Sequence, residues 1–338
     1  MNAKPIASFN ENDIRPDGLM AGHADRMRAD LERLQVHRRE FVEVPCPACG
    51  SERAQPTFEK YQFNYQTCVD CETVYISPRP TSGHLEEHYR HSENYAYWNR
   101  YIFPIAEETR REKIFRPRVE RILDACRRQG IIPQGLLEVG AGFGTFCEEL
   151  KSAGAFARII AVEPTPDLAE SCRKRGLEVI DKPIEQVSLE PGSVNVVASF
   201  EVIEHLFSPA SFIETCANLL PSGGLLVLTC PNIKGFDITV LQAASDAVDF
   251  EHLNYFHPAS LAMLVTKFGF EVVEVATPGK LDAELVRKKV ISGAVALEDR
   301  FLSQVLIHDW ERVGASFQAF LADNQLSSHL WLVARKLA

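Results

Sequence analysis

A glycine-rich turn at residues 136–146 constrains the fold of this chain more than any other stretch. Its sequence is an apolar run that passes into three glycines spaced two apart and then into a helical pattern. We therefore predict a strand, a tight turn and a helix. Glycines at such a turn tolerate positive φ and let the backbone approach a ligand, while the N–H groups that open the helix point at it. A nucleotide-like cofactor is the expected occupant.

From residue 135 onward, strand patterns alternate with helix patterns. Such alternation is typical of a mostly parallel sheet wound on both faces, whose ligands bind at the carboxyl ends of the strands. Helical periodicity between residues 281 and 321 predicts a helical insertion before the last strand. The predicted fold class is α/β, a Rossmann-like doubly wound sheet of seven strands. We expect these strands at residues 136–139, 158–162, 177–180, 193–200, 225–230, 270–276 and 329–334, and core helices at 145–153, 166–175, 209–220 and 259–268.

Four of the nine cysteines form two pairs near the amino terminus. Cys46 and Cys49 make one Cys-x2-Cys pair, and Cys68 and Cys71 make a second pair after an 18-residue spacer. Four thiolates at this spacing are typical of a tetrahedral zinc site in which each pair forms a knuckle. Such a site has no open position for substrate. We therefore predict a structural zinc that holds a zinc ribbon together.

Composition and periodicity divide the chain into five segments. In the aromatic segment from Tyr89 to Phe103, side chains with polar tips either line a cleft or pack the ribbon onto the next domain, and both readings stay open. Residues 1 to about 20 show no periodicity, and helices are expected at 24–41 and 106–128. The segments are an amino-terminal extension (1–40), the zinc ribbon (41–80), an aromatic linker and helix (81–130), the cofactor-binding core (131–280), and the helical insertion with the final strand (281–338).

The charge balance argues against some classes of partner. The chain has 36 basic and 46 acidic residues, a formal charge of −10, which argues against a broad nucleic-acid surface or an anionic-membrane anchor. No apolar run reaches the roughly 20 residues that span a bilayer, and residues 1–17 lack the order of a signal peptide. We expect a cytoplasmic protein that acts on a small molecule. The sequence does not assign its oligomeric state.

Acidic residues near the turn separate two classes of cofactor. Glu163 ends the second predicted strand, where an acidic residue binds ribose hydroxyls. A dinucleotide-binding pattern would place its third glycine where this chain has Thr145, and Glu138 precedes the glycines. In this turn, and at residues 201–206, 219–224 and 229–232, the chain resembles class I S-adenosylmethionine-dependent methyltransferases.

This resemblance covers about residues 135–276 and implies S-adenosylmethionine as cofactor. One departure is Asn195, where relatives often carry Asp. By the same resemblance, residues 181–184 border adenine. The implied cofactor-binding residues are Glu138, Gly140, Ala141, Gly142, Gly144, Glu163, Pro164, Phe200 and Glu201.

A second group of polar residues follows the fourth predicted strand. An alcohol acceptor must be held against the sulfonium methyl group and must lose its proton. Glu201, Glu204 and His205 begin at that strand end, and His252 belongs to a histidine-bearing segment at the same edge. Two carboxylates and two imidazoles suit a divalent ion, magnesium or another, that binds adjacent hydroxyls.

The pattern of these four residues is similar to that of methyltransferases that modify the terminal ribose of small RNAs or catechol rings in quinone synthesis. This similarity implies metal-ligand roles for Glu201, Glu204, His205 and His252. Two readings without a metal stay open. His205 would be a metal-free base or substrate binder in one, and the residues would buttress the turn in the other.

The ribbon, the run at residues 77–80 and the tail after residue 277 resemble bacterial methyltransferases of surface-polysaccharide or modified-sugar synthesis. This resemblance implies O-methylation of a sugar, a sugar conjugate or another small hydroxyl-bearing metabolite. The alternatives are sugar C-methylation, RNA methylation with the ribbon as reader, and a non-catalytic binding protein.

Overall fold

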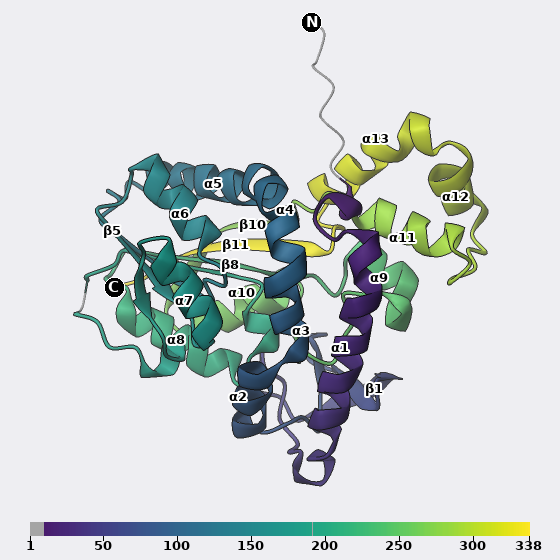
Figure 1. Cartoon of the computed structure of the whole chain (residues 1–338), viewed down its shortest axis with the longest axis horizontal. Coiled ribbons are helices and arrows are strands. Elements are labelled where there is room, and N and C mark those ends of the chain that lie inside the picture. Colours follow the sequence, from purple (N-terminus) through teal and green to yellow (C-terminus); the bar gives the residue numbers. More distant parts are fainter. Residues whose placement is uncertain (1–9, 191) are drawn as a thin grey trace, which may run out of the picture.

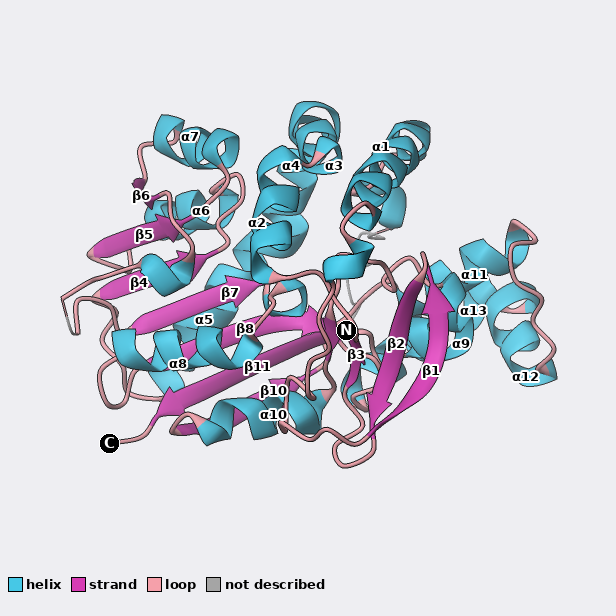
Figure 2. Cartoon of the chain, turned by 90° about the horizontal axis from the view of Figure 1, so that it is seen from below, coloured by secondary structure: helices cyan, strands magenta, loops and turns pink. Residues whose placement is uncertain are grey.

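The computed structural model of the chain describes residues 10–190 and 192–338. A large sheet with helices on both faces forms the body of the molecule, and a smaller sheet lies beside it (Figures 1 and 2). Residues 1–9, the start of the predicted extension, lie outside the described residues. Among the helices that the structure describes, none is long and apolar enough to cross a membrane.

The large sheet has seven strands, as the sequence predicts. Their spatial order is β10-β11-β8-β7-β4-β5-β6, and β11 runs antiparallel to both of its neighbours. All residues of β4, β7 and β8 are buried, which is typical of parallel strands covered on both faces. The strands are β4 (Gly135–Val139), β5 (Arg158–Val162), β6 (Glu178–Ile180), β7 (Val196–Phe200), β8 (Leu225–Pro231), β10 (Phe270–Ala276) and β11 (His329–Lys336).

Alternate residues of these strands pack against helices on opposite faces. Leu136 belongs to the apolar cluster formed with α5 and α6, whereas Leu137 belongs to the cluster formed with α8 and α10. This two-residue period follows from the pleat of a strand. The helices are α5 (Arg116–Arg128), α6 (Thr145–Ala153), α7 (Pro166–Lys174), α8 (Pro209–Leu219) and α10 (Pro258–Lys267).

The fourth strand of the core starts later than predicted. We expect it from residue 193, but β7 begins at Val196. The chain bends at Asn195, whose side-chain oxygen accepts hydrogen bonds from the backbone N–H groups of Gln134 and Gly135 at 3.2 and 3.3 Å. The Asn195 backbone still bonds to both neighbouring strands, because its N–H donates to the Gly135 carbonyl at 2.9 Å and its carbonyl accepts from the Leu225 N–H at 3.0 Å. The side-chain bonds therefore fasten this bend to the start of β4.

The amino-terminal region is more helical than predicted. Helix α1 spans Asp17–Gln35 rather than residues 24–41, and Pro16 stands before its first residue with a φ of −59° that suits a helix start. The aromatic segment also folds into helices. These elements are η1 (Glu11–Asp13), η2 (Arg38–Glu40), α2 (Ser82–His91), α3 (Glu93–Tyr97), the π turn η3 (Trp98–Ile102), α4 (Phe103–Arg110) and the π turn η4 (Arg111–Phe115), which leads into α5.

The cysteine-bearing region is not a separate sheet. Strand β3 pairs with β9, a two-residue strand just before α10, so the smaller sheet has the order β1-β2-β3-β9. Helix α9 and the turn η7 precede β9, and neither was predicted. The elements are β1 (Ala54–Lys60), β2 (Phe63–Cys68), β3 (Val74–Ile76), α9 (Phe236–Leu241), η7 (Gln242–Ala244) and β9 (Asn254–Tyr255).

The helical insertion before the last strand is present as predicted. Its helices share an apolar cluster with α9 and protrude at one end of the molecule (Figure 1). Asp282 fixes its base by accepting a hydrogen bond from the Ser327 hydroxyl at 2.6 Å. The insertion consists of α11 (Asp282–Ile291), α12 (Arg300–Ser303), the π turn η8 (Gln304–His308) and α13 (Trp310–Asp323).

Candidate active site

The glycine turn after β4 leaves a stretch of backbone uncovered. Gly140, Gly142 and Gly144 all have positive φ, at 75°, 55° and 76°. A Cβ on Gly140 would lie 2.4 Å from Val202, and one on Gly144 would lie 2.7 Å from Leu177, so packing excludes larger residues at both positions. At Gly142 a Cβ would meet nothing within 4 Å. The turn therefore packs tightly against its neighbours at Gly140 and Gly144 and is open at Gly142. This openness fits a cofactor that lies against the backbone.

Glu163 joins the end of β5 to this turn. One oxygen of its buried carboxylate accepts a hydrogen bond from the Gly142 N–H at 2.8 Å, and the other accepts from the Thr165 N–H at 2.9 Å. Burial raises the pKa of the Glu163 carboxyl. Each oxygen keeps a second lone pair, which suits it to the hydroxyls of a ribose. Pro164 follows on the surface.

Glu138 is a buried carboxyl at the end of β4. The Cys147 thiol donates a hydrogen bond to it at 3.0 Å, and burial raises the pKa of Glu138 to about 8. Arg118 of α5, which the sequence analysis did not single out, lies near it and lowers this pKa. The Arg118 guanidinium stands 4.5 Å over the Phe200 ring. A carboxyl and a guanidinium beside the turn suit the ammonium and carboxylate of an amino acid.

Glu201 turns away from the other residues of the predicted metal set. It ends β7 in the left-handed region with a φ of 56°, a strained position for a residue other than glycine. Its Oε1 accepts a hydrogen bond from the Thr229 hydroxyl at 2.6 Å and lies 3.3 Å from His329 Nδ1 and 3.6 Å from Arg118 Nη2. Thr229 and His329 come from β8 and β11, and no sequence pattern marked them.

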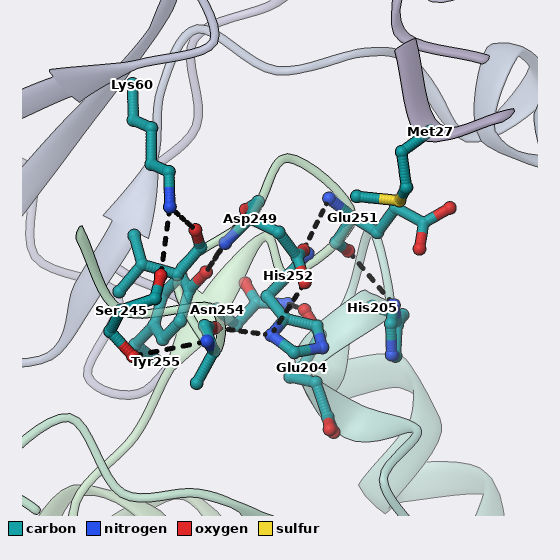
Figure 3. A network of polar contacts seen from close by, with 12 residues as sticks. Met27, Lys60, Glu204, His205, Ser245, Asp249, Glu251, His252, Asn254 and Tyr255 are labelled. Atoms are coloured by element: carbon teal, nitrogen blue, oxygen red, sulfur yellow. Dashed lines mark hydrogen bonds and ion pairs between the residues drawn. The ribbon is translucent and has the colours of Figure 1, made fainter. Parts of the chain in front are cut away.

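The other three predicted ligands do meet. Glu204, His205 and His252 each offer a ligand atom within 4.8 Å of the other two (Figure 3). His205 Nδ1 lies 3.1 Å from the Glu251 carbonyl oxygen, and His252 Nδ1 lies 2.8 Å from the Ala247 carbonyl oxygen. Because a carbonyl can only accept, each ring carries its proton on Nδ1 and leaves a lone pair on Nε2. Burial holds the pKa of His205 well below its usual range, so the ring is neutral.

The Glu204 carboxyl has no hydrogen-bond partner within the described part of the chain. It is fully buried, and both oxygens lack a donor. Burial and the charge of Glu201 raise the pKa of Glu204 well above its usual range. An unsatisfied buried carboxyl is costly, and a cation among these three residues would supply the missing partner. Two imidazoles held through Nδ1 are also typical of metal ligands.

Aromatic residues of α2 and α3 cover this group. The Tyr89 hydroxyl lies 3.3 Å from His205 Nδ1, and the Tyr95 ring meets the Tyr89 ring edge-on at 5.8 Å. Next to them the buried His88 Nε2 lies 3.1 Å from the Glu251 carboxylate. The aromatic segment therefore does both things that the sequence left open. Tyr89 lies over the histidines, whereas Tyr97 packs and donates to the Leu19 carbonyl at 3.0 Å.

The four paired cysteines form a second cluster. Cys46 and Cys71 sulfurs are 3.4 Å apart, as are those of Cys49 and Cys68, and all four lie within 4.8 Å of one another. Tetrahedral zinc with bonds of about 2.3 Å would separate its sulfurs by about 3.7 Å, so this donor set fits zinc.

Comparisons with known proteins identify the family of the core. A model of the methyltransferase domain family matches residues 106–275, about half of the chain. The chain is 28% identical over 155 residues to a ubiquinone biosynthesis O-methyltransferase of Xanthomonas euvesicatoria, a match that covers 42% of this chain and 64% of that protein. It is 31% identical over 162 residues to a probable S-adenosylmethionine-dependent methyltransferase of Mycobacterium tuberculosis, covering 47% of this chain and 54% of that one.

Among solved structures, an S-adenosylmethionine-dependent methyltransferase of Archaeoglobus fulgidus matches with a TM-score of 0.48 and 19% identity, over 70% of this chain and 100% of that one. The two curated relatives named above are each matched over less than two thirds of their length. The family match itself covers the whole cofactor turn and the strand ends around it. The chain belongs to the methyltransferase domain family.

Proposed function

We propose that this enzyme O-methylates a small metabolite with adjacent hydroxyls, a sugar or a sugar conjugate, and that a divalent ion at Glu204, His205 and His252 assists it. The observation that carries the proposal is the Glu204 carboxyl. It is buried without a hydrogen-bond partner among the described residues, and it lies with two imidazoles whose Nδ1 atoms are held by backbone carbonyls. A magnesium-like or other divalent cation is the group that this donor set fits.

On the cofactor side, S-adenosylmethionine supplies the methyl group. Glu163 binds the ribose hydroxyls through the lone pairs that its backbone hydrogen bonds leave free. Glu138 and Arg118 hold the ammonium and carboxylate of the methionine end beside the glycine turn. These contacts orient the sulfonium methyl toward the end of β7, so that the acceptor is attacked from a fixed position.

On the acceptor side, the divalent ion lowers the pKa of a bound hydroxyl when it is present. The backbone carbonyls of Ala247 and Glu251 keep the two imidazoles in the tautomer that binds it. Tyr89 and Tyr95 cover the group and exclude water from it. Glu201 stays paired with Thr229 and Arg118, where it holds the turn beside the methyl donor.

Oxygen as the acceptor atom has support from the relatives that are named as O-methyltransferases. The sugar assignment rests on the amino-terminal resemblance. We also propose a structural zinc at Cys46, Cys49, Cys68 and Cys71, because the four sulfurs are already arranged for a closed tetrahedral site.

The test is methyl transfer from labelled S-adenosylmethionine to a panel of nucleotide sugars and catechols, each paired with an analogue that lacks one of two adjacent hydroxyls. The protein is first stripped of exchangeable ions while metal analysis confirms that about one zinc per chain is retained, the number that a four-thiolate site holds. We expect transfer to the diols to require added magnesium or manganese. Full-rate transfer without an exchangeable ion would contradict the proposed role of a divalent ion. Equal transfer to the analogues would show that the acceptor does not need adjacent hydroxyls.

A further inference from the structure

Arg110, the last residue of α4, is a cation without a carboxylate partner. Within residues 10–190 and 192–338 no Asp or Glu oxygen lies within 4.0 Å of its guanidinium; its Nη2 donates to the Ile14 carbonyl at 3.3 Å, and its buried Nε has no acceptor. Residues 1–9 contain no Asp or Glu. Burial lowers the pKa of Arg110 to about 9, and the positive charges of Arg15 and Arg118 add to this effect.

The adjacent arginine shows how unusual this is. Arg111 pairs with Glu107, Glu148 and Glu149 at 2.8, 2.7 and 2.6 Å, and these ion pairs fasten the helix to α6. Arg110 is one residue away and points elsewhere. Arg110 is only partly buried, and it lies over aromatic rings, Trp98 at 5.7 Å and Phe103 at 4.8 Å, and not beside a carboxylate. Its guanidinium can therefore pair with an anion from outside the chain.

The π turn between Arg110 and Arg118 directs both side chains to one side. A π turn holds one residue more than an α turn, so the eight residues from 110 to 118 rotate the helix about as far as seven do in a regular α-helix, roughly 20° short of two full turns. The two guanidinium groups thus share the helix face that looks toward the cofactor turn. Arg118 has Glu201 at 3.6 Å, whereas Arg110 has no such partner.

A cavity of about 360 Å³ opens beside Arg110. Its aromatic wall includes Phe103 and Phe143, whose ring centroids are 3.9 Å apart, and Arg110 stands 4.8 Å over the Phe103 ring. Phe143 lies between two glycines of the cofactor turn, so the cavity borders the methyl-donor site. Lys174 adds a cation at the exposed rim, and the other charges of the lining, Glu107 and Arg175, are paired with each other at 2.7 Å.

We propose that the cavity at Arg110 binds the anionic end of the acceptor, a phosphate or a carboxylate, so that the substrate of this methyltransferase is an acid. This inference rests on the proposed function and deepens it. Arg110 offers donors in a planar fork that matches either group, and the aromatic wall accommodates the ring attached to it. Phosphate of a nucleotide-linked sugar and carboxylate of an acidic sugar are the two sources of this chemistry.

The test is calorimetry on the full chain saturated with S-adenosylhomocysteine, with inorganic pyrophosphate as one probe and glucuronate as the other. We expect the wild type to bind one of them, and the tighter probe identifies the source. Arg110→Gln should raise its Kd about 10- to 100-fold, the loss expected for a charged hydrogen bond. Arg110→Lys should recover part of the affinity. Arg100→Gln, at an exposed arginine ten residues upstream in the same helical run, is the matched control and should change nothing.

Binding of neither probe to the wild type would overturn the inference. So would a loss of S-adenosylhomocysteine affinity in Arg110→Gln with probe binding intact, because the arginine would then belong to the cofactor site. In the transfer assay, the bound probe should compete with the acceptor and not with S-adenosylmethionine. If a diol that carries the bound anionic group is methylated equally by wild type and Arg110→Gln, the proposed function stands and this inference falls.

Discussion

The candidate active site has two halves at one edge of the sheet, and the two are built in different ways. The cofactor half, comprising Glu138, the glycine turn and Glu163, comes from one strand–turn–helix–strand unit, and its hydrogen bond between Gly142 and Glu163 joins residues only 21 apart. The acceptor half, comprising Glu204, His205, His252 and Tyr89, joins residues 116 apart in the contact of Tyr89 with His205. The first half follows from local sequence, whereas the second depends on packing.

The halves also differ in how their polar groups are satisfied. Both Glu163 oxygens already accept backbone N–H groups, which fixes the carboxylate before the cofactor arrives. The Glu204 oxygens have no partner within the described residues, and a ligand atom of each of the two histidines lies within 4.8 Å of that carboxyl. The cofactor half is thus preorganised by its own backbone, whereas the acceptor half is complete only with a further ligand.

Replacing Glu204 separates the halves most strongly. Glu204→Gln keeps the shape of the side chain and removes the charge that a cation needs, so kcat should fall about 10²- to 10⁴-fold. The Kd for S-adenosylhomocysteine, measured by calorimetry, should stay within about twofold, since the residue lies in the other half. Glu214→Gln on the exposed face of α8 is the control. A matching loss of cofactor affinity would show that the halves are not independent.

Glu163→Gln is the reverse experiment. Loss of the charged acceptor for the ribose hydroxyls should raise the Kd for S-adenosylhomocysteine about 10- to 100-fold. At saturating cofactor, kcat should change little. The exposed Glu170→Gln on the following helix serves as the control. A large drop in kcat at saturation would contradict the assignment of Glu163 to ground-state cofactor binding.

What the sequence predicts follows the same division. The seven strands, the glycine turn and the acidic strand ends are local features with a fixed spacing, and all appear where expected except the start of β7. At that exception the chain bends at Asn195, and the Asn195 side chain satisfies two backbone N–H groups of the neighbouring strand start. Periodicity registers apolar burial, and it does not register such a side-chain bond.

The acceptor half is less predictable because its contacts are not local. Four metal ligands are expected from the spacing of Glu201, Glu204, His205 and His252, but the left-handed φ of Glu201 aims its carboxylate at Thr229. Arg118 joins the site only through the packing of α5. Helix α9 and strand β9 lie in a segment where no element was predicted. The pairing of β9 with β3 depends on tertiary contacts and not on the two-residue stretch itself.

The pH dependence of cofactor binding tests the cofactor half alone. Burial raises the pKa of Glu138 to about 8, so below that pH the free enzyme carries a neutral acid. A bound ammonium favours the ionised form and releases the proton, so affinity must rise with pH up to the pKa. We expect the Kd for S-adenosylhomocysteine to fall on the order of tenfold between pH 6.5 and 8. Glu138→Gln should bind weakly without this slope. A wild-type Kd that is flat over this range would exclude the ammonium contact.

Tyr89→Phe should have the smallest effect. It tests the contribution of the Tyr89 hydroxyl, which lies over the acceptor half. The Tyr89 oxygen shares the Nδ1 proton of His205 with the Glu251 carbonyl, at 3.3 against 3.1 Å. Removing it leaves the better partner in place, so the ring keeps its tautomer and kcat should fall only about three- to tenfold. Tyr97→Phe, which loses a hydrogen bond to the Leu19 carbonyl away from the histidines, is the control. A loss as large as that of Glu204→Gln would mean that Tyr89, and not the carbonyl, orients His205; an unchanged kcat would mean that its hydroxyl only fills space.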